Sequence, residues 1–480
     1  MSTDDRKAMK MFEETCEKVG DRYVIGLPWK RDPLELPDNR PLAEKRLMSL
    51  ERSLLKQPEK AALYTKTVNE YLEKGWAVPV KPNELEIKPA FYLPHHGVYR
   101  PEKVSTPLRV VFDPACNYDG VSLNSFLHNG PNLIGDLLGV LIRFREDLVA
   151  IVGDISKMFL QVLLKEEETH VHRFMWRDLD VTRKPDVYRL TRVTFGDKPS
   201  PDMASFVILK IAQEYQNTYP DTAENLKKDR YMDDMIHSCP SDNTAVQRMS
   251  SLDKMLGSGG FRMKEWYCSA ITRKPEMGES HGTKPGININ LSQDSIKTLG
   301  VGWNPSTDSI LFQVKDLGLD GFTKRLVLSR LSMLFDPLGL ATPVTIRAKC
   351  AMQAIWRLEN VGWDDTLPTE HTEMWREIFQ ELNELETIRL PRCVKPVDAI
   401  EGTAELHTFA DTSIKAYGAV AYMVWSTPQG PSVRLMAAKA RVALLRQTTI
   451  PCLELMAAPL AARLARTIHS ELRIKPSVHF

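Results

Sequence analysis

The chain has 480 residues, 43% of them hydrophobic, and a formal net charge of +1. This length favours two to four domains, and the balanced charge argues against a protein that coats nucleic acid over its whole surface. Seven cysteines without a C-x-x-C pair argue against disulfides or zinc, and the lack of a signal-peptide core or an ~18-residue apolar run argues against secretion or membrane insertion. We therefore expect a soluble, intracellular protein without a membrane partner.

Hydrophobic periodicity predicts alternating helices and strands in the first half of the chain. Helices are expected over residues 42–56, 61–74, 133–144, 200–216 and 243–256. Strands are expected over residues 108–112 and 148–154, and a hairpin at residues 231–234. The order of strand, helix, hairpin and helix predicts an α+β domain with a mainly antiparallel sheet.

The second half changes character twice. Residues 272–296 are rich in Gly, Pro, Ser and Asn and predict a loop or linker, whereas residues 323–390 predict helices, including one over 345–358. Strands return at residues 406–410 and 419–422, followed by a helix over 453–468.

The most informative stretch is Tyr231-Met232-Asp233-Asp234. Adjacent carboxylates at a hairpin tip repel unless divalent cations bind them, as in two-metal phosphoryl transfer. Taken alone, the pair is more often a solvated turn. Asp154 supplies a third carboxylate at the end of an apolar strand, although a lone Asp there is more often a cap. Together they predict a site for two Mg²⁺ ions, with Mn²⁺ as an alternative. Asp234 would be an auxiliary ligand or a group that contacts the ligands.

Three further features predict a nucleotide pocket. Phe159 could exclude a 2′-hydroxyl, although a lone Phe is more often core. In the segment from residue 194 to 201, Gly196 would let a base pair approach the backbone, and Ser200-Pro201 would start a helix; alone, an ordinary helix start is equally good. Arg109 could hold a triphosphate, although alone it is more often a surface residue.

The order of these features resembles that in reverse transcriptases: a strand carboxylate, a sugar-gating aromatic, a Gly-x-x-x-Ser-Pro loop and a Tyr-Met-Asp-Asp hairpin. Further segments resemble the BEL/Pao class of LTR retrotransposon polyproteins over nearly the whole chain. These segments are Arg22–Lys30, Arg109–Asp113, Gly120–Asn124, Asp136–Arg145 and Phe335–Leu340.

The resemblance implies an α+β right-hand polymerase of fingers, palm and thumb, followed by a truncated ribonuclease H-like α/β segment. Asp154, Asp233 and Asp234 would be the catalytic, metal-binding triad. The implied parts are an N-terminal extension with the start of the fingers (1–90), fingers and palm (91–270), primer-grip hairpin, thumb and connection (271–400), and an incomplete ribonuclease H-like domain (401–480).

The resemblance also assigns the residues that would contact the incoming nucleotide. They are Arg109, Phe159, Gly196, Ser200, Pro201, Tyr231, Met232 and Lys264. Two positions depart from the family pattern: Phe195 stands where retroviral enzymes carry Gln, and Glu265 occupies a position that is usually basic. Lys264 is therefore the only nearby candidate for a proton donor to the pyrophosphate.

A second site is expected to be incomplete. Asp411 and Glu454 resemble the first two carboxylates of a ribonuclease H fold, but the chain stops at Phe480, in the strand that should lead to the third. Ribonuclease H activity is therefore not expected, and a structural subdomain is the favoured interpretation. An aspartic peptidase is not expected either, because Asp411-Thr412 is followed by Ser413 instead of Gly.

The leading hypothesis is an RNA-directed DNA polymerase of a BEL/Pao-type retroelement. Its expected partners are an RNA or DNA template-primer duplex, dNTPs and other products of the same polyprotein. The competing hypothesis is a decayed or domesticated copy that binds nucleic acid or a protein without catalysis, and a third is a nuclease using Asp411 and Glu454. A cytoplasmic location is expected, with virus-like particles or the nucleus as alternatives, and the chain is expected to be a fragment of a longer polyprotein.

Overall fold

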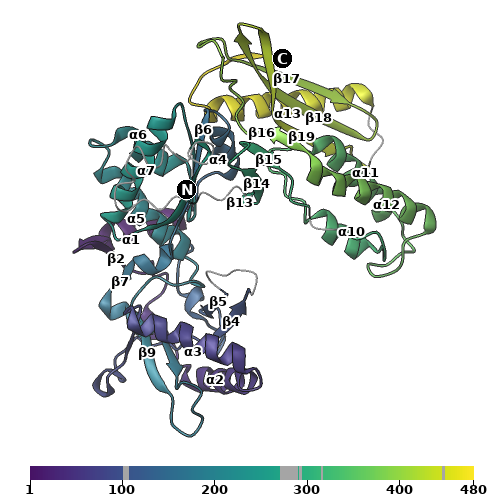
Figure 1. Cartoon of the computed structure of the whole chain (residues 1–480). Helices are drawn as coiled ribbons and strands as arrows, with labels where there is room; N and C mark the ends of the chain where they lie inside the picture. The colour runs from purple at the N-terminus through teal and green to yellow at the C-terminus, as the bar shows by residue number, and fades with distance from the viewer. Residues whose placement is uncertain (101–106, 271–289, 291–294, 315–316, 446–448) are drawn as a thin grey trace. The chain divides into compact units, whose positions relative to one another are not determined.

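The computed structural model of the chain describes residues 1–100, 107–270, 290, 295–314, 317–445 and 449–480 (Figure 1). The loop expected over 272–296 lies almost entirely outside the described residues. Contacts divide the chain into two compact units, each assembled from separate stretches of sequence. The first comprises Met1–Ile134, Ile155–Lys227 and Leu252–Arg262, and the second Gly135–Asp154, Lys228–Ser251 and Met263–Phe480. The four consecutive parts expected from the sequence remain a prediction.

The first unit combines helices with small sheets. Its helices are α1 (Thr3–Thr15), α2 (Arg40–Leu54), α3 (Pro58–Glu73), α5 (Ser200–Glu214) and most of α6 (Pro220–Lys228). Its sheets have the orders β1-β2-β7, β3-β9-β8 and β4-β5. The strands are β1 (Glu17–Val19), β2 (Arg22–Ile25), β3 (Ala77–Pro79), β4 (His95–Tyr99), β5 (Leu108–Phe112), β7 (Leu163–Leu164), β8 (Arg173–Trp176) and β9 (Asp186–Leu190).

Local sequence explains the helix boundaries in this unit. Helices α2 and α3 begin two to three residues earlier than expected, because a proline in the first turn has the φ angle that a helix needs and no N–H to leave unsatisfied. Helix α3 ends before Gly75, whose φ of +64° confirms the predicted stop. Strand β5 lies over the expected residues.

His95 is a structural residue in the core of the first unit. Its Nδ1 lies 2.6 Å from the Tyr64 hydroxyl, and its Nε2 lies 3.0 Å from the Met175 carbonyl. Burial lowers the pKa of His95 to about 4, so the ring is neutral at physiological pH. The imidazole therefore completes an aromatic core and is not a metal ligand.

The second unit contains the sheet that carries the predicted carboxylates. The sheet has the order β10-β11-β6-β12. Helix α4 (Leu137–Phe144) and the first part of α7 (Asp242–Gly257) belong to the same unit. Its strands are β6 (Val149–Ile155), β10 (Arg230–Tyr231), β11 (Asp234–Cys239) and β12 (Met263–Cys268). Helix α4 begins four residues later than expected, because the Asp136 carboxylate caps it by accepting a hydrogen bond from Gly139 N at 2.9 Å.

The rest of the second unit contains a small sheet, four α-helices and a larger sheet, within the described ranges after residue 295. The small sheet has the order β13-β14-β15-β16, and the larger one β19-β18-β17-β20. The elements are β13 (Ile296–Thr298), β14 (Val301–Asn304), β15 (Ser309–Leu311), α10 (Lys324–Leu331), α11 (Thr342–Trp356), α12 (Thr369–Glu384), β16 (Arg389–Pro391), β17 (Glu405–Thr412), β18 (Ala416–Thr427), β19 (Gly430–Val442), α13 (Ile450–Glu471) and β20 (Ser477–His479).

The larger sheet has a ribonuclease H-like arrangement. Strands β17, β18 and β19 form an antiparallel meander, whereas β20 runs parallel to β17. Helix α13 packs on this sheet, and its buried Leu453, Leu460 and Leu464 share one hydrophobic core with Trp425 of β18. The strand predicted at 419–422 is the middle of the longer β18. No helix in the described ranges is long and apolar enough to cross a membrane.

Candidate active site

Asp233 lies at the tip of a tight β-hairpin, as the sequence predicts. Tyr231 and Asp234 are partners in the β10–β11 ladder, so Met232 and Asp233 form a two-residue turn. Met232 has a φ of +56°, a left-handed conformation that tight hairpins require and that is uncommon for Met. Arg230 braces the turn, because its Nη1 donates to the Met232 carbonyl at 2.7 Å. The hairpin therefore presents an exposed Asp233 on a braced turn.

Asp154 and Asp234 lie directly opposite each other on neighbouring strands. Strands β6 and β11 are antiparallel with Asp154 and Asp234 in register, so both side chains project from the same face of the sheet. Opposed side chains have Cβ atoms about 4.5–5.5 Å apart, and like charges at that distance repel. A donor set made only of carboxylate oxygens suits Mg²⁺, which would remove this repulsion. The residues present therefore fit a divalent cation.

The three aspartates are not gathered as tightly as a preformed metal cage. Among the described residues, the one group of three metal-type ligands with ligand atoms within 4.8 Å of one another is Glu405, His407 and His479. That group lies on the ribonuclease H-like sheet, where His407 Nε2 is 2.7 Å from Glu405 Oε2 and stacks on His479. These contacts account for the group without an ion.

Strand β12 borders β6 on the other side and carries Lys264. The Lys264 side chain is 44% exposed, and its Nζ lies 3.8 Å from Glu265 Oε1. Trp266 of β12 is buried against β6 at Gly153, where an added Cβ would come 2.6 Å from the indole ring. The residue next to Asp154 must therefore be glycine for the two strands to pack.

This close packing gives a first prediction. Gly153→Val should lower the free energy of unfolding by about 1–3 kcal/mol, because the new side chain displaces Trp266 in a filled core. Thermal or denaturant unfolding measures the loss. Gly257→Ala is the matched control, since no atom lies within 4 Å of its Cβ position, and it should leave stability unchanged or slightly raised. Equal stability of both variants would contradict the packing argument.

The sequence did not single out the buried charges that support the hairpin. Asp229 immediately precedes β10, and its carboxylate lies 2.6 Å from Arg143 Nε and 2.8 Å from His237 Nδ1. Burial alone would raise the pKa of Asp229, but hydrogen bonds and charges from His237 and Arg143 lower it to about 2. The available signal was a charged residue, Arg143, within the apolar α4, because a buried charge needs a partner.

In the first unit, two residues with predicted roles, Phe159 and Arg109, lie against one aromatic ring, that of Phe195. Phe159 lies on a short 3-10 helix (Met158–Gln161), is buried, and meets Phe195 edge-on with ring centroids 4.7 Å apart. The Arg109 guanidinium carbon lies 5.9 Å from the centroid of the same Phe195 ring. Phe195, the departure from the family pattern, therefore joins the predicted sugar gate to the predicted triphosphate ligand.

The segment from residue 194 to 201 is held by the protein itself. Gly196 has a φ of +117°, and an added Cβ would come 2.6 Å from the Phe112 carbonyl oxygen. The sequence analysis explained the glycine at position 196 by the approach of a base pair. In the structure, the backbone at the end of β5 already leaves no room for a larger residue at this position. Asn124 Nδ2 donates to the Gly196 carbonyl at 3.0 Å, and its Oδ1 accepts from Lys198 N at 2.9 Å.

Ser200 and Pro201 start α5, as predicted. The Ser200 hydroxyl donates to the Thr194 carbonyl at 2.6 Å and is buried, so it closes this segment. Asp197 is fixed by buried His172, whose Nε2 lies 2.8 Å away; burial opposes the charge, but Asp197 raises the pKa of His172 above its ordinary value. The segment is therefore preformed.

The predicted carboxylates of the ribonuclease H-like domain are both exposed. Asp411 lies near the end of β17 and accepts a hydrogen bond from Thr412 N at 2.7 Å. Glu454 lies in the first turns of α13, which packs against β17. Strand β20 lies where the sequence predicted the last strand, and the structure shows that it pairs in parallel with β17.

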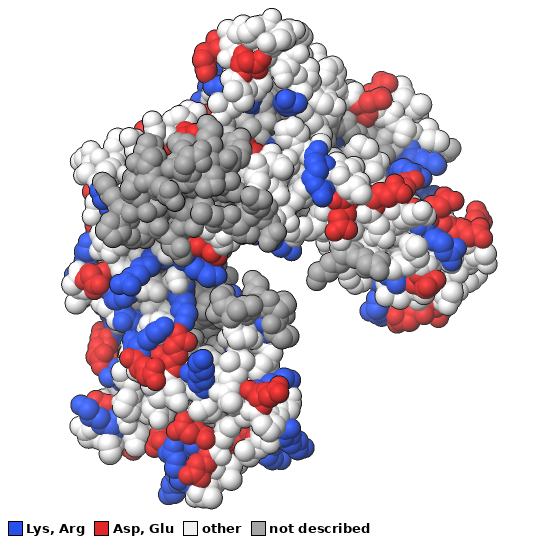
Figure 2. All heavy atoms as spheres, in the orientation of Figure 1, with Lys and Arg blue, Asp and Glu red and all other residues white. Residues whose placement is uncertain are grey.

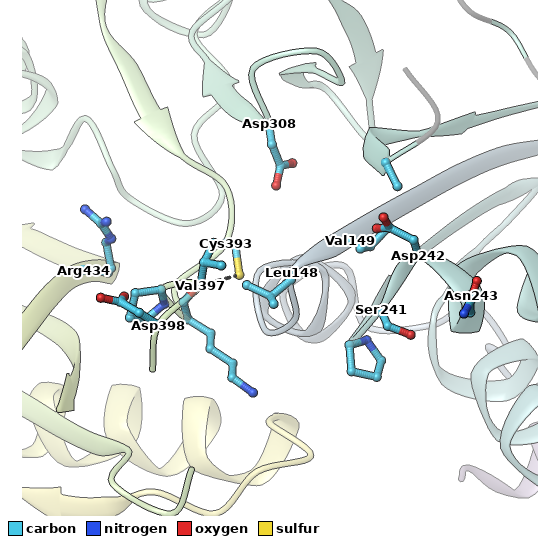
Figure 3. Close-up of a pocket in the computed structure, with 14 residues that line it drawn as sticks. Leu148, Val149, Ser241, Asp242, Asn243, Asp308, Cys393, Val397, Asp398 and Arg434 are labelled. Carbon is cyan, nitrogen blue, oxygen red and sulfur yellow. Dashed lines mark hydrogen bonds between the residues drawn. The ribbon is translucent and has the colours of Figure 1, made fainter. Parts of the chain in front are cut away.

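Two surface features lie outside the predicted site. On the face drawn in Figure 2, Lys and Arg are interspersed with Asp and Glu, in keeping with the net charge of +1. A cleft of about 870 Å³ in the second unit is lined by Leu148, Asp242, Asp308, Cys393 and neighbours (Figure 3). None of the predicted site residues lines this cleft, which borders the end of β6 remote from Asp154.

Comparisons with known proteins identify the class of enzyme to which the first half of the chain is similar. Residues 129–303 match the family described as reverse transcriptase (RNA-dependent DNA polymerase), so this part of the chain is a reverse transcriptase domain. A solved foamy viral protease-reverse transcriptase in complex with RNA/DNA hybrid is similar, with 13% identity and a TM-score of 0.53, covering 98% of this chain and 54% of that one. A second, the dRH form in complex with double-stranded DNA, has 14% identity and a TM-score of 0.53, covering 83% and 59%.

The particular family follows from the second half. Residues 323–480 match the Pao retrotransposon-like RNaseH-like domain. The two matches, in this order along the chain, support a BEL/Pao-type reverse transcriptase region followed by a ribonuclease H-like domain, and the α+β right-hand fold is confirmed. It spans little more than half the length of the solved structures it matches. A search of curated proteins found no match.

Proposed function

We propose that the protein is an RNA-directed DNA polymerase of a BEL/Pao-like retroelement, extending a primer with dNTPs by two-metal-ion catalysis. The observation that carries the proposal is the pairing of Asp154 with Asp234 across β6 and β11, beside Asp233 in the turn. In the reaction, the primer 3′-oxygen bonds to the α-phosphorus of the dNTP, and pyrophosphate leaves. The family match of residues 129–303 supports the same reaction.

Asp154 and Asp233 would hold two divalent cations, and Asp234 would be the auxiliary ligand. When bound, such cations lower the pKa of the attacking hydroxyl and neutralise the triphosphate. The donors are all carboxylate oxygens, which Mg²⁺ prefers and Mn²⁺ accepts. We therefore propose two Mg²⁺ ions, with Mn²⁺ as an alternative.

The proposed ligands are a template-primer duplex and dNTPs. Arg109 would contact the triphosphate, Phe159 would exclude the ribose 2′-hydroxyl, and Lys264 would donate a proton to the pyrophosphate. The remaining residues proposed to shape the nucleotide and template-primer contacts are Gly196, Ser200, Pro201, Tyr231 and Met232. The similar foamy viral structures contain an RNA/DNA hybrid and double-stranded DNA, which supports this choice of ligand. An intracellular, cytoplasmic location and association with other products of the polyprotein are also proposed.

One assay tests the proposal. The protein is incubated with an RNA template, a labelled DNA primer, dNTPs and Mg²⁺, and elongation that depends on both template and dNTPs is expected. Duplex binding without elongation would overturn the proposal in favour of a non-catalytic nucleic-acid-binding copy. Cleavage of the template without elongation would instead favour a nuclease that uses Asp411 and Glu454.

A further inference from the structure

A continuous set of ion pairs and hydrogen bonds links the predicted catalytic hairpin to the end of α13, all within the second unit. The set joins three places: the end of α4, the hairpin strands and the turn after α13. Its members are Arg143, Glu146, Asp147, Asp229, His237, Ser238, Glu471, Arg473 and Ile474. The segment from Asp136 to Arg145 resembled the family in sequence, and the proposed reaction gives it no role.

Arg473 contacts the ends of both central strands of the carboxylate-bearing sheet. Its Nε donates to Glu146 Oε2 at 2.7 Å and its Nη2 to Asp147 Oδ2 at 3.0 Å, just before β6 begins. The same Nη2 lies 3.1 Å from the carbonyl oxygen and 3.0 Å from the hydroxyl of Ser238, on β11. Glu146 and Ser238 are buried, so few other groups could replace these contacts.

His237 connects Arg473 to the base of the hairpin. Its Nδ1 donates to the Asp229 carboxylate at 2.8 Å, and Arg473 Nη1 lies 3.3 Å from Nδ1 and 3.4 Å from Nε2 of the same ring. His237 and Asp229 each have side chains only 2% exposed. The contact between His237 and Asp229 therefore lies in the protein interior, whereas the Arg473 side chain is 36% exposed.

Glu471, the last residue of α13, reaches the same place from another direction. Its carboxylate accepts from Arg143 Nη1, while Arg143 Nε donates to Asp229 and Nη2 to the Lys228 carbonyl. An added Cβ at Gly139 would come 2.6 Å from Glu471 Oε2, so a glycine one turn before Arg143 makes room for this ion pair.

The set ends close to the catalytic turn. Asp229 precedes Tyr231 by two residues, and its carbonyl accepts from Ile236 N at 2.9 Å, two residues beyond Asp234. A displacement of Asp229 therefore moves both strands that carry the turn. Buried ion pairs contribute little net stability but fix one arrangement of the groups that they join.

We infer that Glu471 and Arg473 are positioning residues for the polymerase reaction: the end of the ribonuclease H-like helix α13 holds the catalytic hairpin in its working geometry. The inference rests on the proposed function. It makes the ribonuclease H-like domain a required part of the polymerase site, without a contact to substrate. A misplacement of about 1 Å at reacting groups lowers rates on the order of 10²-fold, so the expected effect is on turnover.

The test uses the full chain in four variants. Arg473→Gln and Gly139→Ala should each lower kcat for primer extension on the order of 10–100-fold, with KM for dNTP and Kd for template-primer within about 3-fold of wild type. Arg473→Lys, which keeps the charge but not the fork, should recover part of kcat. Arg466→Gln is the matched control, since Arg466 is an exposed arginine of α13, the helix that precedes Arg473, and should leave kcat unchanged.

Gly139→Ala separates positioning from folding. Alanine favours a helix over glycine, so the variant should fold, while its methyl group pushes aside only the flexible ends of two side chains, Glu471 and Arg143. Hydrogen exchange at the amides of residues 229–239 provides a readout that needs no activity, and faster exchange is expected in Gly139→Ala and Arg473→Gln but not in Arg466→Gln. Unchanged kcat and unchanged exchange in both folded variants would overturn the inference. Absence of extension by wild type would overturn the proposed function, and the exchange experiment would still decide the inference.

Discussion

Asp233→Asn is expected to abolish primer extension, with a loss on the order of 10³-fold or more, because a neutral amide is a poor ligand for the cation that the reaction needs. Asp154→Asn should have the same effect. Asp233 is exposed in a turn whose geometry comes from Met232 and Arg230, so the substitution leaves the hairpin in place. Gel-based extension on an RNA template measures the loss, and fluorescence anisotropy with labelled duplex should show binding close to that of wild type.

Asp154→Asn should also change stability: the variant that loses activity is expected to be more stable than wild type in the absence of metal. In metal-free buffer, Asp154→Asn should raise the free energy of unfolding by up to about 1 kcal/mol, because it removes repulsion between Asp154 and the opposed Asp234. Added Mg²⁺ should then stabilise wild type more than the variant, since a ligand of the native state adds stability by mass action. Robust synthesis by Asp154→Asn or Asp233→Asn would show that the two carboxylates are not needed for the reaction. This conclusion would hold whatever the stability measurements show.

Local signals made part of this site visible in the sequence. The apolar run before Asp154 predicted β6 to within one residue, and the acidic pair between short extended segments predicted the hairpin. Ser200-Pro201 predicted the start of α5 because serine and proline are suited to a first helical turn. Each of these signals resides within a few neighbouring residues, so no tertiary contact was needed to interpret it.

The parts that could not be predicted depend on partners far away in the sequence. Nothing local shows that Gly196 packs on the Phe112 carbonyl, or that Arg143 of an apolar helix pairs with Asp229. Strand β19 was missed because its run of small and basic residues has weak alternation until it pairs with β18. Resemblance to a family supplied the roles of residues, whereas the contacts that hold them came only from the structure.

Phe159→Val is expected to change the choice of sugar more than the rate of synthesis. If the Phe159 ring excludes the 2′-hydroxyl, removal of most of its volume should reduce discrimination of dNTP over rNTP by roughly 10–100-fold, the range that a few missing carbons command. The ring also packs on Phe195, so the variant should lose about 1–3 kcal/mol of stability. Single-nucleotide incorporation with paired dNTP and rNTP gives kcat/KM for each.

Phe195→Leu tests whether the bulk of Phe159 itself, or the packing of Phe159 on Phe195, sets the discrimination against rNTP. It removes the aromatic partner of both Phe159 and Arg109 while leaving the ring at 159 in place. Discrimination against rNTP should therefore stay close to wild type, whereas KM for the nucleotide should rise if Arg109 relies on Phe195 for its position. Equal loss of sugar discrimination in Phe195→Leu and Phe159→Val would mean that general loosening of the pocket, and not the bulk of Phe159, sets the preference. Selectivity lost only in Phe159→Val would identify that side chain as the group that meets the sugar.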